Sequence, residues 1–153
     1  MNENQNKLTL AICVGISGSG KTRKSKELAG ERNWARGSSD EFRAEISGDE
    51  NNQSCSQEAF SALRNLVNDS LKNGKSIIVD ATNLTASNRN LFFKLADIYG
   101  AEKIAYCFNV DLAVAKQRNK SRDRVVPDWV LERQQSKLSW PTAEEGCQVI
   151  WVN

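Results

Sequence analysis

Apolar residues lie in short runs that are separated by longer stretches of mixed polarity. These runs span residues 8–14, 76–80, 103–110 and 148–152. The first is continuous and contains β-branched residues, which is typical of a strand buried on both faces of a parallel sheet. Residues 33–38 predict a further short strand. The sequence therefore predicts about five strands.

Helix signals occupy the stretches between the strands. Helices are expected at residues 21–32, from an N-cap at Ser39 through Ile46, at 56–72, from a cap at Asp111 through Arg118, and from Pro127 to Leu138. One more helix, ending at Gly100, is indicated by apolar positions Leu91, Phe92, Leu95, Ala96 and Ile98. Residues 47–56 are polar and predict a loop.

The alternation of strands and helices predicts the fold class. Helical segments long enough for crossovers favour right-handed βαβ units, and hence a parallel sheet covered on both faces. We expect one α/β three-layer domain over residues 1–153, with residues 1–7 as a flexible tail.

The composition indicates what class of protein this is and where it is located. With 39% hydrophobic and 26% charged residues, the chain resembles an ordinary globular protein. A net charge of +2 gives no bulk signal for nucleic-acid binding, so any anion site must be local. The N-terminus lacks a secretory signal and no run is long enough to span a membrane, which predicts a cytoplasmic protein. The four widely spaced cysteines are expected to be reduced and buried.

The absence of histidine limits the chemistry. Histidine is the commonest general base and the commonest metal ligand, and the sequence contains none. Acid–base catalysis must therefore use a carboxylate.

A phosphate-binding loop follows the first strand. Residues 15–22 match the pattern G-x-x-x-x-G-K-[ST], and the expected cradle comprises Gly15, Ser17, Gly18, Ser19, Gly20, Lys21 and Thr22. Its backbone N–H groups and the following helix would hold the phosphates of ATP. Lys21 would neutralise the β- and γ-phosphates, and the Thr22 hydroxyl would bind Mg²⁺. This motif predicts a P-loop NTPase fold with strand order 2-3-1-4-5.

Asp80 ends the strand at residues 76–80. Ligands in open α/β sheets bind beyond the carboxyl ends of strands, so Asp80 is a candidate to hold a magnesium water or to support Thr22. The alternative is an aspartate that only caps the next turn.

Asp40 and Arg43 are candidates for the acceptor side. They lie three residues apart at the start of a predicted helix and would project from one face. Asp40 could accept a proton from an incoming hydroxyl while Arg43 holds a phosphate. The alternative is a capping aspartate with a solvent-facing arginine.

A basic stretch at residues 114–124 contains Arg118 and Arg122, one helical turn apart. Two guanidinium groups on one face could clamp phosphates, or one could stack on adenine, as in a helical lid. The alternative is a solvated charged face.

Together these segments resemble the 5′-kinase domain of the polynucleotide kinase family, found in phages and in bacterial and eukaryotic end-healing enzymes. The resemblance rests on residues 15–22, 39–43, 79–84, 118–122, 126–127 and 140–146. It implies that Asp40 is the general base toward the 5′-hydroxyl and that Arg43 contacts the acceptor phosphate. It also implies that Arg122 engages the donor phosphates, with Arg118 on the adenosine side. A phage origin would place the protein in the host cytoplasm.

The chain also departs from this family. It carries no phosphatase, ligase or phosphohydrolase module, so we expect a free-standing kinase that works beside a separate phosphatase or ligase. Residues 44–59 match no family element, and Ala81 occupies a position that is polar in some relatives. The acceptor therefore stays open.

The sequence thus predicts an enzyme that transfers the ATP γ-phosphoryl group to a 5′-hydroxyl of DNA or RNA, with Lys21, Asp40, Arg43 and Arg122 as catalytic residues. One alternative is a P-loop kinase acting on a small hydroxylated molecule or an aminoacyl-tRNA. Another is a nucleotide-binding switch or toxin-like module.

Overall fold

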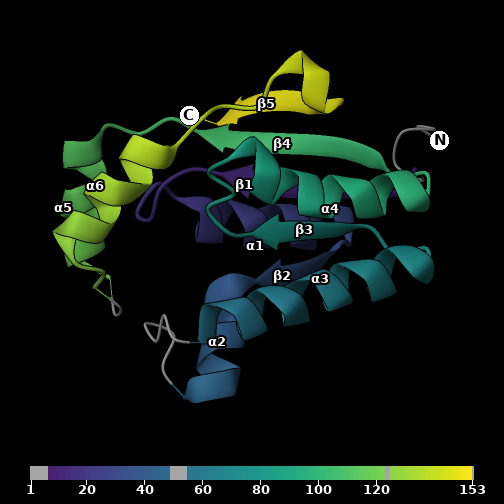
Figure 1. Cartoon of the computed structure of the whole chain (residues 1–153), viewed down its shortest axis with the longest axis horizontal. Coiled ribbons are helices and arrows are strands. Elements are labelled where there is room, and N and C mark those ends of the chain that lie inside the picture. The colour runs from purple at the N-terminus through teal and green to yellow at the C-terminus, as the bar shows by residue number, and fades with distance from the viewer. Residues whose placement is uncertain (1–6, 49–54, 123–124, 153) are drawn as a thin grey trace.

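The computed structural model describes residues 7–48, 55–122 and 125–152. Its elements are β1 (Thr9–Val14), α1 (Lys21–Arg32), β2 (Ala35–Ser38), α2 (Ser39–Ser47), α3 (Ser56–Lys72), β3 (Ile77–Asp80), α4 (Ala86–Ile98), β4 (Glu102–Phe108), α5 (Leu112–Lys120), α6 (Asp128–Lys137), the 3₁₀ turn η3 (Ala143–Glu145) and β5 (Gln148–Val152). Figure 1 shows α5 and α6 at the end of the sheet toward which the strands run.

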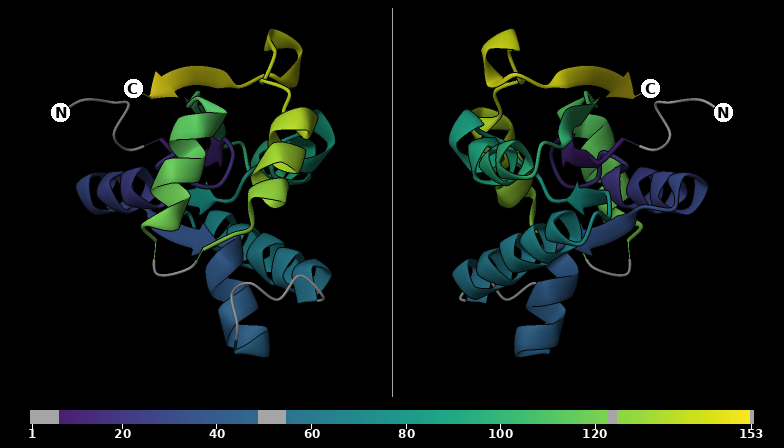
Figure 2. Two further views of the ribbon diagram at one scale, coloured as in Figure 1. Left: turned by 90° about the vertical axis from the view of Figure 1, so that its left-hand side faces the viewer. Right: turned by 90° about the vertical axis from the view of Figure 1, so that its right-hand side faces the viewer.

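The five strands form one parallel sheet in the order β2-β3-β1-β4-β5, as the sequence predicts. Helix α1 covers one face, and α3 and α4 cover the other (Figure 2). The chain is therefore a three-layer α/β domain.

The central strand β1 explains why both faces are covered. Its residues 10–14 are fully buried and alternate between two apolar clusters. Leu10 and Ile12 pack with α3 and α4 around Phe92, whereas Ala11 and Cys13 pack with Leu28 of α1. Successive side chains of a strand point to opposite faces, so a continuous apolar run can serve two cores at once.

A third apolar cluster attaches α5 and α6 to the sheet. Ile16 of the loop after β1 packs with Leu84, with Ala115 of α5 and with Leu131 of α6. All four are buried. This cluster fixes α5 and α6, together called the lid helices below, directly against the glycine loop.

Several predicted boundaries were wrong by one or two residues. Strand β2 begins at Ala35 because Asn33 adopts a left-handed conformation, with φ 54°, and closes α1. The N-cap of α2 is Ser38 rather than Ser39, since the Ser38 side chain accepts a hydrogen bond from the Glu41 N–H. Strand β4 ends at Phe108 instead of residue 110.

Two expectations fall largely outside the described residues. Of the expected tail at residues 1–7, only Lys7 is described, and it pairs with Glu102 at 3.1 Å. In the expected loop at residues 47–56, Ser47 ends α2, Ser56 begins α3, and residues 49–54 lie outside the description.

The cysteines are free thiols, as expected. Cys13, Cys55 and Cys107 are buried, but Cys147 is only half-buried because it precedes the edge strand β5. In the described parts of the chain, every helix is too short or too polar to cross a bilayer.

Candidate active site

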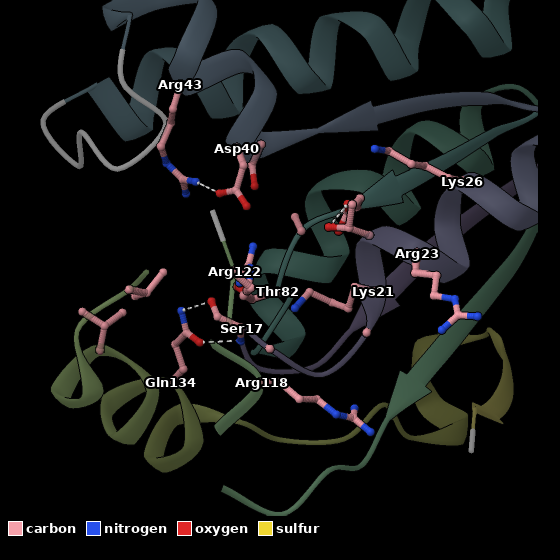
Figure 3. A pocket seen from close by; sticks show the side chains of 18 of the residues that line it. Ser17, Lys21, Arg23, Lys26, Asp40, Arg43, Thr82, Arg118, Arg122 and Gln134 are labelled. Atoms are coloured by element: carbon pink, nitrogen blue, oxygen red, sulfur yellow. Dashed lines mark hydrogen bonds and ion pairs between the residues drawn. The ribbon is translucent and has the colours of Figure 1, made fainter. Parts of the chain in front are cut away.

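A cavity of about 560 Å³ lies at the carboxyl ends of the strands, between the glycine loop, α2 and the lid helices. Ten of the predicted site residues line it: Ser17, Gly18, Gly20, Lys21, Thr22, Asp40, Arg43, Asp80, Arg118 and Arg122. Figure 3 shows the labelled side chains among them, such as Lys21, Asp40 and Arg122, coming from separate elements. The structure thus brings together segments that are far apart in the sequence.

Gly15 and Ser19 do not line the cavity but support the loop from behind. A Cβ atom on Gly15 would lie 2.9 Å from the Ser19 hydroxyl oxygen. The Ser19 side chain is buried, and its oxygen has no hydrogen-bond partner among the described residues. These two residues therefore pack the back of the loop.

The loop offers a helix N-terminus to an anion. Helix α1 begins at Lys21 after Gly20, which adopts a left-handed conformation with φ 100°. Its first turn has neither a side-chain cap nor an acidic residue. Uncapped N–H groups at the positive end of a helix bind phosphate oxygens.

Lys21 lies on the floor of the cavity and is only 8% exposed. Its Nζ donates a 2.7 Å hydrogen bond to the carbonyl of Ile16. Burial lowers the pKa of Lys21 below its ordinary value, and the nearby carboxylate of Asp80 opposes this shift. The loop thus holds a cation where the phosphates are expected.

Thr22 and Asp80 meet as the sequence predicts. The Thr22 hydroxyl donates a 3.0 Å hydrogen bond to Oδ2 of Asp80. A hydroxyl and a carboxylate are oxygen ligands that suit Mg²⁺, which keeps several waters and needs few protein ligands. Among the described residues, no group of three acidic or sulfur side chains offers a fuller cage. This pair therefore fits a magnesium ion bound jointly with substrate phosphates.

Arg36 is a site residue that the sequence analysis missed. Its NH2 donates to the same Oδ2 of Asp80 at 2.6 Å, its NH1 to Glu41 at 2.7 Å, and its Nε to Ser25 at 2.8 Å. An arginine inside a short predicted strand was the available signal, because a buried guanidinium requires an acidic partner.

Asp40 and Arg43 form an ion pair on the first turns of α2. Both line the cavity, which confirms that they project from one face. The Arg43 Nε also lies 3.4 Å from the Ser56 hydroxyl at the start of α3. In Figure 3 the pair lies across the cavity from Lys21.

The lid arginines both line the cavity, but they do not share a helical face. Arg118 lies on α5, whereas Arg122 lies beyond the helix end at Lys120. Figure 3 shows the two side chains extending in different directions. Helix α5 ends at Lys120, next to the buried Asn119, whose side chain bonds both the N–H and the carbonyl of Val126. The prediction of two arginines one turn apart on a helix was therefore wrong.

Gln134 of α6 is a second residue that the sequence analysis missed. Its Oε1 accepts a 2.8 Å hydrogen bond from the Ser17 N–H, and its Nε2 lies 3.1 Å from the Ser17 hydroxyl oxygen. The partners are 117 residues apart, and no local pattern connects them.

The cavity attracts anions. Its lining includes the cations Lys21, Arg23, Lys26, Arg43, Arg118 and Arg122, against the carboxylates Asp40 and Asp80. Clefts lined mainly by one sign of charge concentrate ligands of the opposite sign. The positive charge that the whole-chain balance does not reveal is therefore gathered at this site.

Comparison with known proteins agrees with this arrangement. The model of the AAA domain family matches residues 10–141, which include the glycine loop, both acidic residues of the cavity and the lid. No curated protein matches the sequence.

Solved structures share the fold at low sequence identity. A gluconokinase from Sinorhizobium meliloti 1021 is 17% identical, with a TM-score of 0.67 over 96% of this chain and 83% of that chain. Kti12 from Chaetomium thermophilum, in complex with ADP-AlF3, is 14% identical, with a TM-score of 0.73 over 94% of this chain and 88% of that chain. A chain of the Pnkp1/Rnl/Hen1 RNA repair complex is 24% identical, with a TM-score of 0.69 over 90% of this chain and 46% of that chain. The chain has the P-loop NTPase-like fold that its sequence predicts.

Proposed function

This chain belongs to the AAA domain family, and we propose that it is an ATP-dependent kinase that phosphorylates the 5′-hydroxyl of DNA or RNA. The observation that carries the proposal is the position of the Asp40–Arg43 pair across the cavity from Lys21. A carboxylate facing a phosphate cradle suits deprotonation of a hydroxyl acceptor, and an adjacent arginine suits an acceptor that carries its own phosphate.

The donor half of the site would hold ATP. The first N–H groups of α1 and the Lys21 ammonium would bind the phosphates, and Arg118 would contact the adenosine. Thr22 and Asp80 would hold Mg²⁺, which neutralises charge on the β- and γ-phosphates when bound. Arg122 would add positive charge as negative charge builds up during transfer.

The acceptor half would orient and activate the 5′-hydroxyl. As the 5′-oxygen attacks the γ-phosphorus, its proton passes to the carboxylate of Asp40. A bond forms between the 5′-oxygen and phosphorus while the bond to the β–γ bridging oxygen breaks, and ADP leaves. Arg43 would bind the next phosphate of the acceptor strand and keep the 5′-oxygen in line.

The cation-rich lining supports a polynucleotide acceptor. A strand presents several phosphates near its 5′-end, and the cavity supplies more cations than ATP alone requires. A second candidate is a small hydroxylated molecule, which the cavity volume of about 560 Å³ favours, since this is the size of small-ligand sites.

A panel of acceptors tests the proposal. Transfer from γ-labelled ATP should be measured to 5′-hydroxyl DNA and RNA oligonucleotides, to the same oligonucleotides with a 5′-phosphate, and to sugars and nucleosides. We expect label only on the 5′-hydroxyl oligonucleotides. Label on a sugar or a free nucleoside, with none on the oligonucleotides, would establish the second candidate instead.

A further inference from the structure

The glycine loop is held by the lid at three consecutive residues. Ile16 packs with Leu131 of α6, Ser17 bonds Gln134 of the same helix, and Gly18 lies against α5. A Cβ atom on Gly18 would lie 2.5 Å from the carbonyl oxygen of Ala115. These contacts fix α6 relative to the loop. The position of Gln134 therefore depends on the packing of Leu131 against Ile16 as well as on its own bond to Ser17.

Gln134 faces the cavity. Val130 and Gln134 lie four residues apart on α6, and both line the cavity. Residues with this spacing share one helical face. The next residue of α6, Gln135, is exposed and does not line the cavity.

The side-chain amide of Gln134 lies beside the expected position of the terminal phosphates. Its Oε1 accepts the Ser17 N–H at 2.8 Å. The adjoining carbonyl, that of Ile16, accepts from the Lys21 ammonium at 2.7 Å. Lys21 and Gln134 thus bond the two opposite sides of one trans peptide group, and both line the cavity. Because the lysine of such a loop binds the β- and γ-phosphates, Gln134 lies one peptide group away from their expected position.

The amide also retains a hydrogen-bond donor. A glutamine nitrogen carries two N–H groups, and one of them contacts the Ser17 hydroxyl oxygen at 3.1 Å. No acceptor in residues 7–48, 55–122 or 125–152 takes the second. The Oε1 bond to the Ser17 N–H fixes the orientation of the amide, so the nitrogen stays on the cavity side.

We propose that Gln134 is a donor-site residue that contacts the terminal phosphoryl group of ATP, so that the lid and the loop together bind ATP more tightly than ADP. The inference rests on the donor half of the proposed function and is independent of the acceptor. Gln134 would add a hydrogen bond that only the triphosphate can accept, while its bond to Ser17 keeps α6 seated on the loop.

Binding measurements without any acceptor test this role. Dissociation constants of ADP and of a non-hydrolysable ATP analogue should be measured by calorimetry for the wild type, Gln134→Ala and Gln135→Ala. Because a hydrogen bond to a charged group contributes about 1.5–3 kcal/mol, Gln134→Ala should raise the dissociation constant of the ATP analogue roughly tenfold or more. Binding of ADP should stay within about twofold, and Gln135→Ala should match the wild type for both ligands.

Gln134→Glu provides a second, length-preserving variant. Its carboxylate can still accept from the Ser17 N–H, but it places negative charge beside the terminal phosphate. We expect this variant to lose more affinity for the ATP analogue than Gln134→Ala does, while its affinity for ADP stays unchanged. This variant decides the question if Gln134→Ala unfolds.

Two results would overturn the inference. Equal losses for ADP and the ATP analogue would mean that Gln134 only supports the loop, and unchanged binding of both would mean that it plays no part. If the wild type prefers the ATP analogue through Gln134 but phosphorylates no 5′-hydroxyl, the inference stands and the proposed acceptor is wrong.

Discussion

Arg36 donates a 2.6 Å hydrogen bond to Asp80, and the oxygen that accepts it also accepts from the Thr22 hydroxyl. The Arg36 side chain is 12% exposed and that of Asp80 is 6% exposed. Arg36 further contacts Ser25 of α1 and Glu41 of α2. One largely buried guanidinium thus joins the helix after the glycine loop, the Asp80 carboxylate and the helix that carries Asp40.

Replacing Arg36 should destabilise the protein markedly. Arg36→Ala removes the guanidinium that is hydrogen-bonded to the buried Asp80 carboxylate, which costs about 3 kcal/mol. For a chain of this size, this loss corresponds to a fall in the melting temperature of about 9 °C, measurable by calorimetry. Arg32→Ala is the control, because Arg32 is exposed and stacks on Trp34. A melting temperature for Arg36→Ala equal to that of the control would contradict the structural role.

Asp40→Asn should abolish phosphoryl transfer and spare ATP binding. The amide retains the shape of the carboxylate but cannot accept the proton of the acceptor, and a general base typically contributes about 10²–10⁴-fold to the rate. Single-turnover transfer and the ATP dissociation constant check the two parts separately. Glu45→Gln is the matched control, since Glu45 is an exposed carboxylate on the same helix. Near-full activity of Asp40→Asn would exclude Asp40 as the base.

The affinity for ATP should begin to fall at an alkaline pH that is still lower than the ordinary pKa of lysine. Burial lowers the pKa of Lys21 from 10.5, so this ammonium loses its proton before an exposed lysine does. Below the lowered pKa the charge is present and binding is strong, and binding weakens as the pH rises through that pKa. ATP dissociation constants measured from pH 7.5 upward check this.

Lys21→Met is the control for this pH dependence. It should bind ATP roughly tenfold or more weakly at neutral pH, because a charge-assisted hydrogen bond is lost. Its affinity should then change little with pH. A wild-type affinity that stays constant up to pH 10.5 would contradict the lowered pKa.

Gly18→Ala should loosen the lid from the loop. Gly18 has a φ of 81°, and its new Cβ would meet the Ala115 carbonyl at 2.5 Å. Backbone strain of this kind costs about 1–3 kcal/mol, and the clash adds to it. Gly30→Ala is the matched control, because Gly30 lies in α1 with nothing within 4 Å and should gain about 0.5–1 kcal/mol. Urea unfolding of both variants measures the difference, and equal stabilities would show that the close approach does not matter.

The sequence predicted the parts of the molecule that depend on local pattern. The buried strands follow from continuous apolar runs, and the position of Asp80 beside Thr22 follows from the rule that strand ends meet at one edge. The strand order was also correct, because the glycine-loop motif implies a particular fold.

Long-range side-chain contacts were beyond such reasoning. The bond between Gln134 and Ser17 links residues 117 positions apart, and a glutamine in a polar helix gives no signal of it. Arg122 lies beyond the end of α5, where the side chain of Asn119 makes two hydrogen bonds to Val126. Trp129 and Trp151 are large apolar residues, yet both are more than half exposed, since they lie on α6 and on the edge strand β5.

The position of the acceptor oxygen relative to Asp40 decides whether this carboxylate activates a 5′-hydroxyl. It can be measured in a crystal structure of the protein with a non-hydrolysable ATP analogue, Mg²⁺ and a short 5′-hydroxyl oligonucleotide. We expect the 5′-oxygen about 2.6–3.2 Å from the Asp40 carboxylate and in line with the γ-phosphorus. A 5′-end bound outside the cavity, or an Asp40 carboxylate directed away from the γ-phosphate, would contradict it.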